Sequence, residues 1–376
     1  MKRKIITVLL GITLVFLPTF AYANNEVTEN LDNDYIISTQ QFLAEKGFTD
    51  AEIAALEDDI FQVANLIEIE NMNEEEISIL KNGFLNSSAL LINSEQNSYD
   101  VKEDGIVTFE DGNQTIAPHR NFNSNDANTV LRTPVGSTGP HAITYTLSNY
   151  KFYEATGYVE FPTVSISGSG SGGTGNGQID SRPYMMFGAY QQTSPYKGCD
   201  AGLAYYKEYG GWVLFVNTGG TNGWHQNNSN GKPIHVITKN KVYLDMKLVN
   251  GGVTLIVRDP STWTIIDQLV IPINSGFNDT PSNIELTREV ALAQFERRDN
   301  GDRLSNAHWS QVYVYSKANS LTVPTTAQYL QSSHPDRYSY SDSLPRFLIG
   351  DVKEEIDYIK ITPISNYYEE KISISV

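Results

Sequence analysis

The sequence contains a single cysteine, Cys199, and this scarcity limits how the fold can be stabilised. One cysteine cannot form an internal disulfide, so stability must come from packing of a hydrophobic core. A chain of 376 residues is long enough to bury most of its surface without covalent cross-links. Because free cysteines are usually buried, we expect Cys199 to be a core thiol rather than a catalytic nucleophile.

Basic residues are also scarce, and they form no basic patch beyond the run Lys2-Arg3-Lys4. The chain has 27 Lys and Arg against 44 Asp and Glu. A chain without a basic patch is a poor partner for nucleic acid or for anionic membrane surfaces, so we expect neither. The only long apolar run, residues 5–16, is about 12 residues long and too short to span a bilayer.

That apolar run belongs to a predicted secretory signal peptide at residues 1–23. Lys2, Arg3 and Lys4 precede it, and Ala21-Tyr22-Ala23 has the small-x-small pattern of a cleavage site. We therefore expect a secreted, extracellular protein without a membrane span, whose mature chain begins at Asn24.

Common catalytic motifs are missing. The E-x-D-x-E pattern that jelly-roll glucanases place on one strand is absent, and so is the G-x-S-x-G elbow of serine hydrolases. The six histidines are not spaced like zinc ligands. Glu160, Glu208 and Glu289 stand singly in predicted strands, where a charged side chain usually faces water.

Residues 24–100 form a predicted acidic helical segment. They hold 17 acidic residues against Lys46 and Lys81. Residues 30–92 are the helical part, in which apolar residues from Tyr35 to Ile67 recur at three- and four-residue spacing. We expect three helices, with Gly47 ending the first and Gly83 the third. Two capping boxes support this prediction, at Thr49-x-x-Glu52 and Asn73-x-x-Glu76. The segment is either a helical domain that packs on the rest of the chain or a removable pro-region.

Residues 101–318 predict a β-sandwich. About ten strand-like runs are separated by Gly, Asn, Asp and Pro, and no amphipathic helix lies between them. Asn250-Gly251 is a strong hairpin signal. We expect a mainly β fold, a two-sheet antiparallel jelly-roll sandwich of the concanavalin A-like type, preceded by the helical segment. Residues 319–376 predict a Tyr-rich C-terminal extension with edge strands.

The stretch from Asn217 to Gly231 is a predicted loop without any charged residue. It surrounds Trp224 with amide and hydroxyl groups, and a flat apolar face beside polar edges suits a sugar ring. The predicted ligand-binding residues are Trp224, His225, Asn227 and Asn228, with Asp200 and Tyr206 as neighbours.

Asp299-Asn300-Gly301-Asp302 offers oxygen ligands on a tight turn, as calcium prefers. Asp299, Asn300 and Asp302 are therefore a candidate calcium site. The alternative is an ordinary turn between two strands, which Asn-Gly also favours.

Two motifs resemble the YrpD/YncM-type family of secreted, functionally uncharacterised proteins of Gram-positive bacilli. The first is Asp200-Ala-Gly-Leu-Ala-Tyr-Tyr-Lys-Glu-Tyr followed by Gly211-Trp212, and the second is the run from Leu304 to Asn319 that contains Ala-His-Trp-Ser-Gln-Val-Tyr-Val-Tyr. The resemblance covers roughly residues 105–320. It implies a secreted β-sandwich and brings no known activity.

Three functions remain open from the sequence. The first is a non-catalytic β-sandwich that binds carbohydrate or cell-envelope polymer. The second is a carbohydrate-active enzyme, a polysaccharide lyase or glycosidase, on a jelly-roll fold. The third is an extracellular structural module that contacts proteins through edge strands and the Tyr-rich tail.

Overall fold

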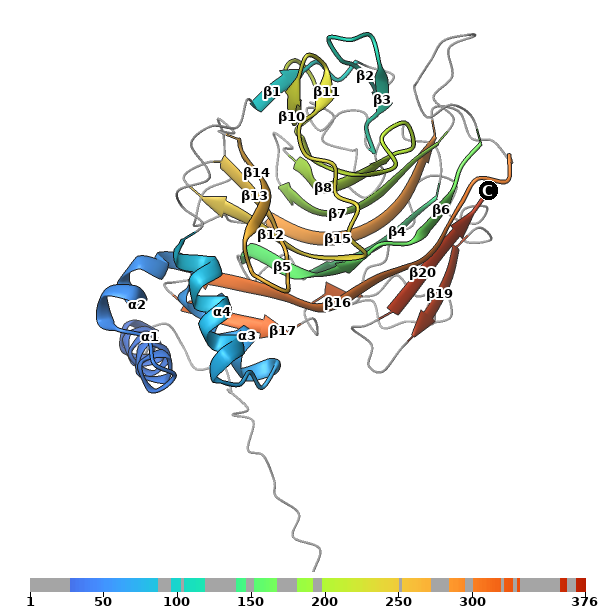
Figure 1. The fold of residues 1–376 in the computed structure, drawn as a ribbon. Coiled ribbons are helices and arrows are strands. Elements are labelled where there is room, and N and C mark those ends of the chain that lie inside the picture. Colours follow the sequence, from blue (N-terminus) through green and yellow to red (C-terminus); the bar gives the residue numbers. More distant parts are fainter. Residues whose placement is uncertain are drawn as a thin grey trace, which may run out of the picture.

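The computed structural model combines two large antiparallel sheets with a group of helices (Figure 1). It describes residues 28–86, 96–102, 105–118, 140–146, 152–167, 181–191, 198–249, 252–271, 284–294, 300–318, 321–326, 330–331, 359–363 and 370–376. The predicted signal peptide lies outside the described residues. The mainly β sandwich with a small N-terminal helical part agrees with the fold class expected from the sequence.

The helical segment contains four α-helices and one 3₁₀ turn among the described residues: α1 (Thr28–Glu45), α2 (Asp50–Leu56), η1 (Glu57–Asp59), α3 (Ile60–Ile69) and α4 (Glu74–Leu85). Both predicted capping boxes are confirmed, at the first turns of α2 and α4. The prediction that Gly83 ends a helix is wrong, because α4 continues past it. A Cβ at Gly83 would lie 2.4 Å from Trp263 Cβ, so glycine here permits close packing of α4 on the sandwich.

Among the described residues, the first sheet, which we call sheet A, has nine strands. Its order is β1-β10-β9-β8-β7-β15-β4-β18, and β11 pairs with β10. The strand bounds are β1 (Gln96–Tyr99), β4 (His141–Thr146), β7 (Ser181–Gln191), β8 (Gly198–Tyr206), β9 (Gly211–Asn217), β10 (Trp224–Ser229), β11 (Lys232–Pro233), β15 (Ile284–Gln294) and β18 (Leu330–Gln331).

The second sheet, sheet C, also has nine strands. Its order is β14-β13-β12-β5-β16-β20-β19, and β6 and β17 both pair with β16. The strand bounds are β5 (Phe152–Glu160), β6 (Thr163–Ser165), β12 (Lys241–Val249), β13 (Gly252–Arg258), β14 (Ile265–Ile271), β16 (Arg303–Ala318), β17 (Leu321–Thr326), β19 (Ile359–Pro363) and β20 (Glu370–Ser375). The pairing of Val249 with Gly252 confirms the hairpin predicted at Asn250-Gly251.

Local hairpins and distant pairings both build the sandwich. Strands β7, β8 and β9 follow one another as antiparallel neighbours. By contrast, β4 pairs with β15, and β5 pairs with β16, although each pair is separated by more than a hundred residues. The C-terminal extension contributes to both sheets: β18 is the edge strand beside β4 in sheet A, and β17, β19 and β20 join sheet C, where β20 lies between β16 and the edge strand β19.

Three hydrophobic clusters fill the molecule. The largest lies between the two sheets and contains Trp212, Trp309 and the buried Cys199. Burial raises the pKa of the Cys199 thiol, which fits the predicted core thiol. The other two clusters lie on the outward faces of the sheets, one against the helices and one beneath residues 96–117.

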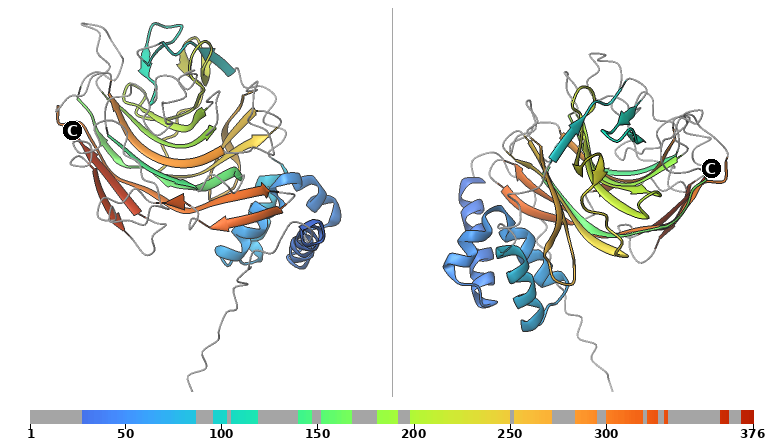
Figure 2. Two further views of the ribbon diagram at one scale, coloured as in Figure 1. Left: turned by 180° about the vertical axis from the view of Figure 1, so that it is seen from behind. Right: turned by 45° about the horizontal axis from the view of Figure 1, so that its top comes forward.

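The outward face of sheet A curves into a concave surface, and residues 96–117 lie over part of it (Figures 1 and 2). Strand β1 joins the edge of sheet A beside β10 and begins before the boundary expected at residue 101. The chain then forms a separate two-stranded sheet from β2 (Ile106–Thr108) and β3 (Gln114–Ile116). Ile116 and Ala117 are buried against the concave face together with Tyr184 and Phe215.

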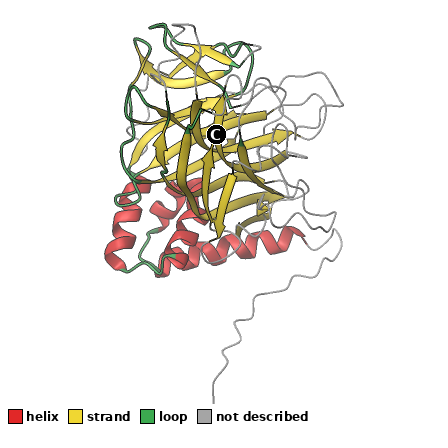
Figure 3. Cartoon of the chain, turned by 90° about the vertical axis from the view of Figure 1, so that its right-hand side faces the viewer, coloured by secondary structure: helices red, strands yellow, loops and turns green. Residues whose placement is uncertain are grey.

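The helices pack on the outward face of sheet C, grouped on one side of the strands (Figure 3). Tyr158, Tyr243, Tyr315 and Trp263 supply the aromatic surface beneath them. The helical segment is therefore packed on the sandwich in the uncleaved chain. In the part of the chain that the structure describes, no helix has both the length and the apolar composition needed to cross a membrane.

Candidate functional site

The predicted binding loop is a strand, and its central side chain is buried. Residues 224–229 form β10, which lies between β9 and β1. Trp224 is 0% exposed and stacks on Phe215, with ring centroids 4.7 Å apart and an interplanar angle of 8°. The expectation of an exposed Trp224 is therefore wrong, because β1 and residues 105–117 cover the face that the uncharged sequence left open.

Two other predicted residues, Tyr206 and Asn228, belong with Trp224 to a buried chain of hydrogen bonds rather than to a surface. The Tyr206 hydroxyl and Trp224 Nε1 both donate to Gln226 Oε1, at 2.9 and 3.3 Å. Gln226 Nε2 donates to Asn228 Oδ1 at 2.7 Å, and Asn228 Nδ2 donates to the Tyr99 hydroxyl at 3.0 Å. Since these groups satisfy one another, the network holds β1 and β10 together.

His225 and Asn227 alternate with these residues and face the other side of β10. Asn227 Nδ2 donates to Asp267 Oδ1 at 2.6 Å and to the Gln268 carbonyl at 2.9 Å. Burial lowers the pKa of His225 to about 4 and raises the pKa of Asp267 to about 6. His225 is the one predicted ligand residue that is only partly buried.

In the candidate calcium site, the described residues Asn300 and Asp302 are engaged in hydrogen bonds within the chain. Asp302 is buried and accepts hydrogen bonds from the backbone and hydroxyl of Ser167, the latter at 2.7 Å, and from Asn300 Nδ2 at 2.9 Å. An amide nitrogen directed at the carboxylate takes the place that a cation would need, which favours the turn. Asp299 lies outside the described residues, and no group of three or more potential His, Cys, Asp or Glu ligands occurs within them.

The remaining predicted residue, Asp200, belongs to a different cluster on the concave face. Strand β8 places Asp200 beside Asn217 of β9, and the Asp200 side chain is fully buried. The Tyr190 hydroxyl donates to Asp200 Oδ1 at 2.5 Å, and Asn217 Nδ2 donates to Asp200 Oδ2 at 3.3 Å. Tyr190 and Asn217 therefore fix the orientation of the Asp200 carboxylate.

Glu289 supplies a second buried carboxylate on the same face. Its Oε1 contacts His141 Nδ1, and both side chains are 0% exposed. Its Oε2 is buried and has no hydrogen-bond partner among the described residues. The expectation that Glu289 is a surface charge is wrong, because β15 lies in the interior of sheet A between β7 and β4.

The strand register brings the two carboxylates to one region. Asp200 lies opposite Gly188 of β7, and Glu289 lies opposite the adjacent same-face residue of that strand, Met186. Asp200 and Glu289 are two strands apart across the sheet and two residues apart along it. Ordinary strand and residue spacings then place their Cα atoms about 12 Å apart, with both side chains on the same face. Burial and the negative charges of Asp200 and Glu289 raise the pKa of Tyr190, so its hydroxyl interacts electrostatically with both carboxylates.

Gly188 allows two hydroxyl groups to approach the backbone of β7 between these carboxylates. A Cβ added there would lie 2.5 Å from Thr287 Oγ1 and 2.6 Å from the Tyr190 hydroxyl. Both hydroxyls therefore lie directly over the Gly188 backbone, between the strands that carry the carboxylates. We call the set of Asp200, Glu289, Tyr190, His141 and Asn217 the acid cluster.

The acid cluster has the groups that general acid–base chemistry requires. Buried carboxylates cost free energy, and a carboxylate oxygen without a partner is unusual in a protein interior unless it has a functional role. The sequence showed Asp200 only as a neighbour of Trp224 and did not show Glu289 at all as a site residue. Only the pairing of β7 with both β8 and β15 brings them together.

Comparisons with known proteins assign no family to the chain. No protein-family model and no curated protein matches it. Similar solved structures include a scytalido-glutamic peptidase with a transition-state analogue inhibitor, at TM-score 0.38 and 7% identity, and SCP-B, an eqolisin-family peptidase with the tripeptide Ala-Ile-His, at 0.37 and 8%. Each match covers 64% of this chain and 100% of the other. Tailspike protein 2 of an Escherichia coli O157:H7 bacteriophage matches at TM-score 0.28 and 17% identity, covering 46% of this chain and 21% of the tailspike. Likenesses of this size transfer no activity to the chain.

Proposed function

We propose that this chain is an exported protein that hydrolyses a polymer on the concave face of its β-sandwich. One observation carries the proposal: two buried carboxylates, Asp200 and Glu289, flank one tyrosine hydroxyl on the same sheet face, and Glu289 Oε2 has no hydrogen-bond partner among the described residues. Two carboxyl groups in different surroundings are a frequent basis of acid–base catalysis.

The chemistry divides between the two sides of the acid cluster. Glu289, oriented by His141, accepts a proton from a water molecule through its unpaired oxygen, and the resulting hydroxide attacks the scissile bond. Burial raises the pKa of Tyr190, so its phenol stays protonated. In the resting site this proton is donated to Asp200, and when the polymer binds the hydroxyl turns and gives the same proton to the leaving atom. When the scissile bond breaks, one product carries the hydroxyl group from water and the other carries the proton from Tyr190. The proton held by Glu289 then returns to the Tyr190 phenolate.

The test is turnover of two polymer panels by the full mature chain. Soluble polysaccharides are assayed for new reducing ends and unfolded proteins for new amino termini. We expect turnover of one panel and a fall of at least about 100-fold in rate for Glu289→Gln and for Asp200→Asn. Wild-type protein that releases neither kind of end, or Glu289→Gln with full activity, contradicts the proposal.

Asp267→Asn is the matched control. Asp267 is also a buried carboxylate on a strand, and it accepts from an asparagine amide as Asp200 does, but it lies on β14 of sheet C. Its replacement should leave the rate unchanged. Urea denaturation of each variant separates lost chemistry from lost folding.

Non-catalytic binding of glycan or cell-envelope polymer is the second candidate, and one observation favours it. The edge strand β1 presents Gln96 and Ser98 to solvent, and its neighbour β10 presents Ser229. Uncharged amide and hydroxyl groups along an open edge suit sugar hydroxyls. Pulldown on insoluble polysaccharides, with Gln96→Ala and Ser98→Ala as the variants, tests this candidate. Retention that both variants leave unchanged counts against it.

A further inference from the structure

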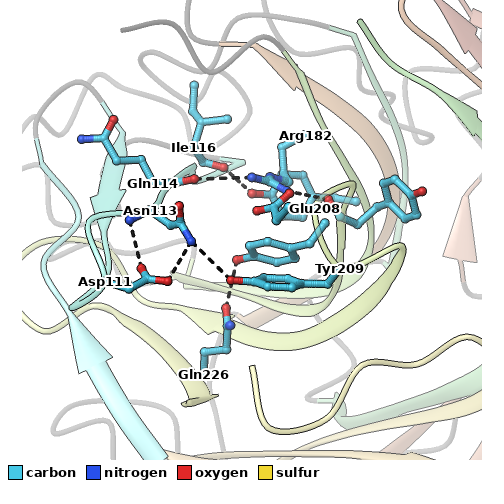
Figure 4. A network of polar contacts seen from close by, with 11 residues as sticks. Asp111, Asn113, Gln114, Ile116, Arg182, Glu208, Tyr209 and Gln226 are labelled. Carbon is cyan, nitrogen blue, oxygen red and sulfur yellow. Dashed lines mark hydrogen bonds and ion pairs between the residues drawn. The ribbon is translucent and has the colours of Figure 1, made fainter. Parts of the chain in front are cut away.

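The concave face already holds an extended piece of the chain by its backbone. Arg182 and Tyr184 are alternate residues of β7 that face the same way. Arg182 Nη2 donates to the Gln114 carbonyl at 3.4 Å, and the Tyr184 hydroxyl donates to the Ile116 carbonyl. The two carbonyls are also two residues apart, as same-facing groups in a strand are. Figure 4 shows this contact, with Gln114 and Ile116 beside Arg182.

We call residues 105–118 the strap. Its two strands, β2 and β3, form a ladder of their own and belong to neither large sheet. Side chains, not a shared backbone ladder, therefore hold this part of the chain on sheet A. A unit held in this way can leave the face without breaking a strand pairing of either sheet.

The receiving side chains are themselves firmly placed. Arg182 is 1% exposed, donates to the Tyr205 carbonyl at 2.8 Å and stacks on the Tyr206 ring, with its Cζ 4.1 Å from the centroid. Glu208 lies 3.8 Å away and balances its charge. Tyr184 is 0% exposed, and burial keeps its phenol protonated. Contacts with Tyr205, Tyr206 and Glu208, none of which belongs to the strap, therefore position Arg182.

The line of the strap leads toward the acid cluster. Along β7 the same-facing residues run from Arg182 and Tyr184 to Met186 and Gly188. Gln114 contacts the first of these residues and Ile116 the second. The next two positions lie opposite Glu289 and Asp200, respectively. A chain that continued in the direction of β3 would reach the carboxylates.

We propose that the concave face binds extended polypeptide by its backbone carbonyls along the line from Arg182 to Gly188 of β7, which we call the groove. Strap residues 114–117 occupy part of this line in place of a peptide ligand. The inference rests on the proposed function for the role of the acid cluster, and it names the substrate class. Recognition through carbonyl oxygens depends little on side chains, so the groove accepts varied sequences of extended peptide.

The first test measures displacement in a chain that cannot turn over its ligand. Glu289→Gln is titrated with a synthetic peptide of residues 111–118, and amide hydrogen exchange is followed along the chain. We expect the peptide to accelerate amide exchange in residues 105–118 at least tenfold. Exchange rates in strands of sheet C, such as β12 and β13, should not change. Unchanged exchange in residues 105–118 at millimolar peptide overturns the inference.

The second test loosens the strap and leaves the groove intact. Ile116→Ala removes a buried strap side chain, and we expect the labelled peptide to bind at least tenfold tighter by fluorescence anisotropy. Adding Tyr184→Phe should then weaken binding about tenfold, because the donor to the peptide carbonyl is lost. A scrambled peptide of the same composition should bind equally well.

The outcomes separate the two proposals. Peptide binding by Glu289→Gln without any hydrolysis by the wild type keeps the groove and removes the proposed catalysis. A different result overturns the polypeptide inference: the wild type hydrolyses only polysaccharide, and Ile116→Ala binds a soluble hexasaccharide but no peptide. The acid cluster would then be a glycan site. If Ile116→Ala does not fold, the displacement measurement decides.

Discussion

At the scale of single residues, the function of Trp224 differs most from what its neighbourhood in the sequence indicates. Its surroundings of Gly, Asn and Ser are typical of a solvent-exposed loop. In the structure it stacks on Phe215 and its indole donates to Gln226, so it stabilises the cover of the concave face.

Trp224→Ala should therefore act on folding. Truncation of a fully buried tryptophan leaves a cavity and costs about 3–5 kcal/mol of the free energy of unfolding. Urea denaturation measures this loss. A variant with unchanged stability and weakened polymer binding would instead restore Trp224 as a binding residue.

His225 and Asp267 give opposite pH dependences of stability. The pKa of His225 is lowered to about 4 in the fold, so between pH 4 and 6.5 the unfolded chain binds the extra proton and stability rises with pH. The pKa of Asp267 is raised to about 6, so between pH 4 and 6 the folded chain binds the extra proton and stability falls with rising pH.

Single variants should reveal each slope. In His225→Gln the increase in the free energy of unfolding between pH 4 and 6.5 should be smaller than in wild type, by up to about 3 kcal/mol. In Asp267→Asn the decrease between pH 4 and 6 should be smaller by a similar amount. Free energies of unfolding measured at pH 4, 5, 6 and 7 test this. Parallel curves for both variants and the wild type would show that neither group is perturbed.

At the scale of elements, the helical segment is fastened to sheet C by a buried charge cluster. Lys247 of β12 contacts Asp59 of η1 and lies 3.6 Å from Asp245 and 4.0 Å from Glu154. Burial raises the pKa of Glu154, which Lys247 partly offsets. The Lys247 ammonium group thus lies close to three carboxylates, one from the helical segment and two from sheet C.

Lys247→Met should leave these buried carboxylates without their cation. We expect a loss of about 3–5 kcal/mol in the free energy of unfolding. Lys241→Met is the matched control, since Lys241 is on the same strand but is 41% exposed and pairs with Glu160 at 3.4 Å. Its effect should stay below about 1 kcal/mol. Equal losses would mean that burial of the cluster is unimportant.

Elements whose signals are local could be predicted from the sequence. The capping boxes of α2 and α4 and the β12–β13 hairpin depend on residues a few positions apart, and all were found. Strand β10 could not be found, because its polar residues show no apolar alternation and become buried only through pairing with β1, more than a hundred residues away. The acid cluster could not be predicted for the same reason, because the sequence of neither β7 nor β15 alone determines the register in which they pair.

At the scale of the whole molecule, the helices and the sandwich share one aromatic interface. Tyr158, Tyr243 and Trp263 pack edge to face with one another beneath the helices, with centroids 5.1–6.2 Å apart. Loss of the helical segment would leave this apolar surface in water, which favours a segment that remains bound over a released pro-region.

Cleavage of the linker tests this directly. A specific protease site introduced within residues 87–95 should allow cutting without dissociation, because the interface rather than the peptide bond holds the segment. We expect both fragments to elute together in native size-exclusion chromatography and to separate in urea. Separation in native buffer would support a removable pro-region.

The pairing of β4 with β15 and of β5 with β16 also has a consequence in time. Both sheets have central strands whose partners are synthesised more than a hundred residues later. At about 5–20 residues per second, β4 and β5 wait roughly 10–30 s for those partners to leave the ribosome. Until then neither sheet can be completed, so the sandwich stays open to chaperones until β15 and β16 have been synthesised, although local hairpins such as β7-β8-β9 can form earlier.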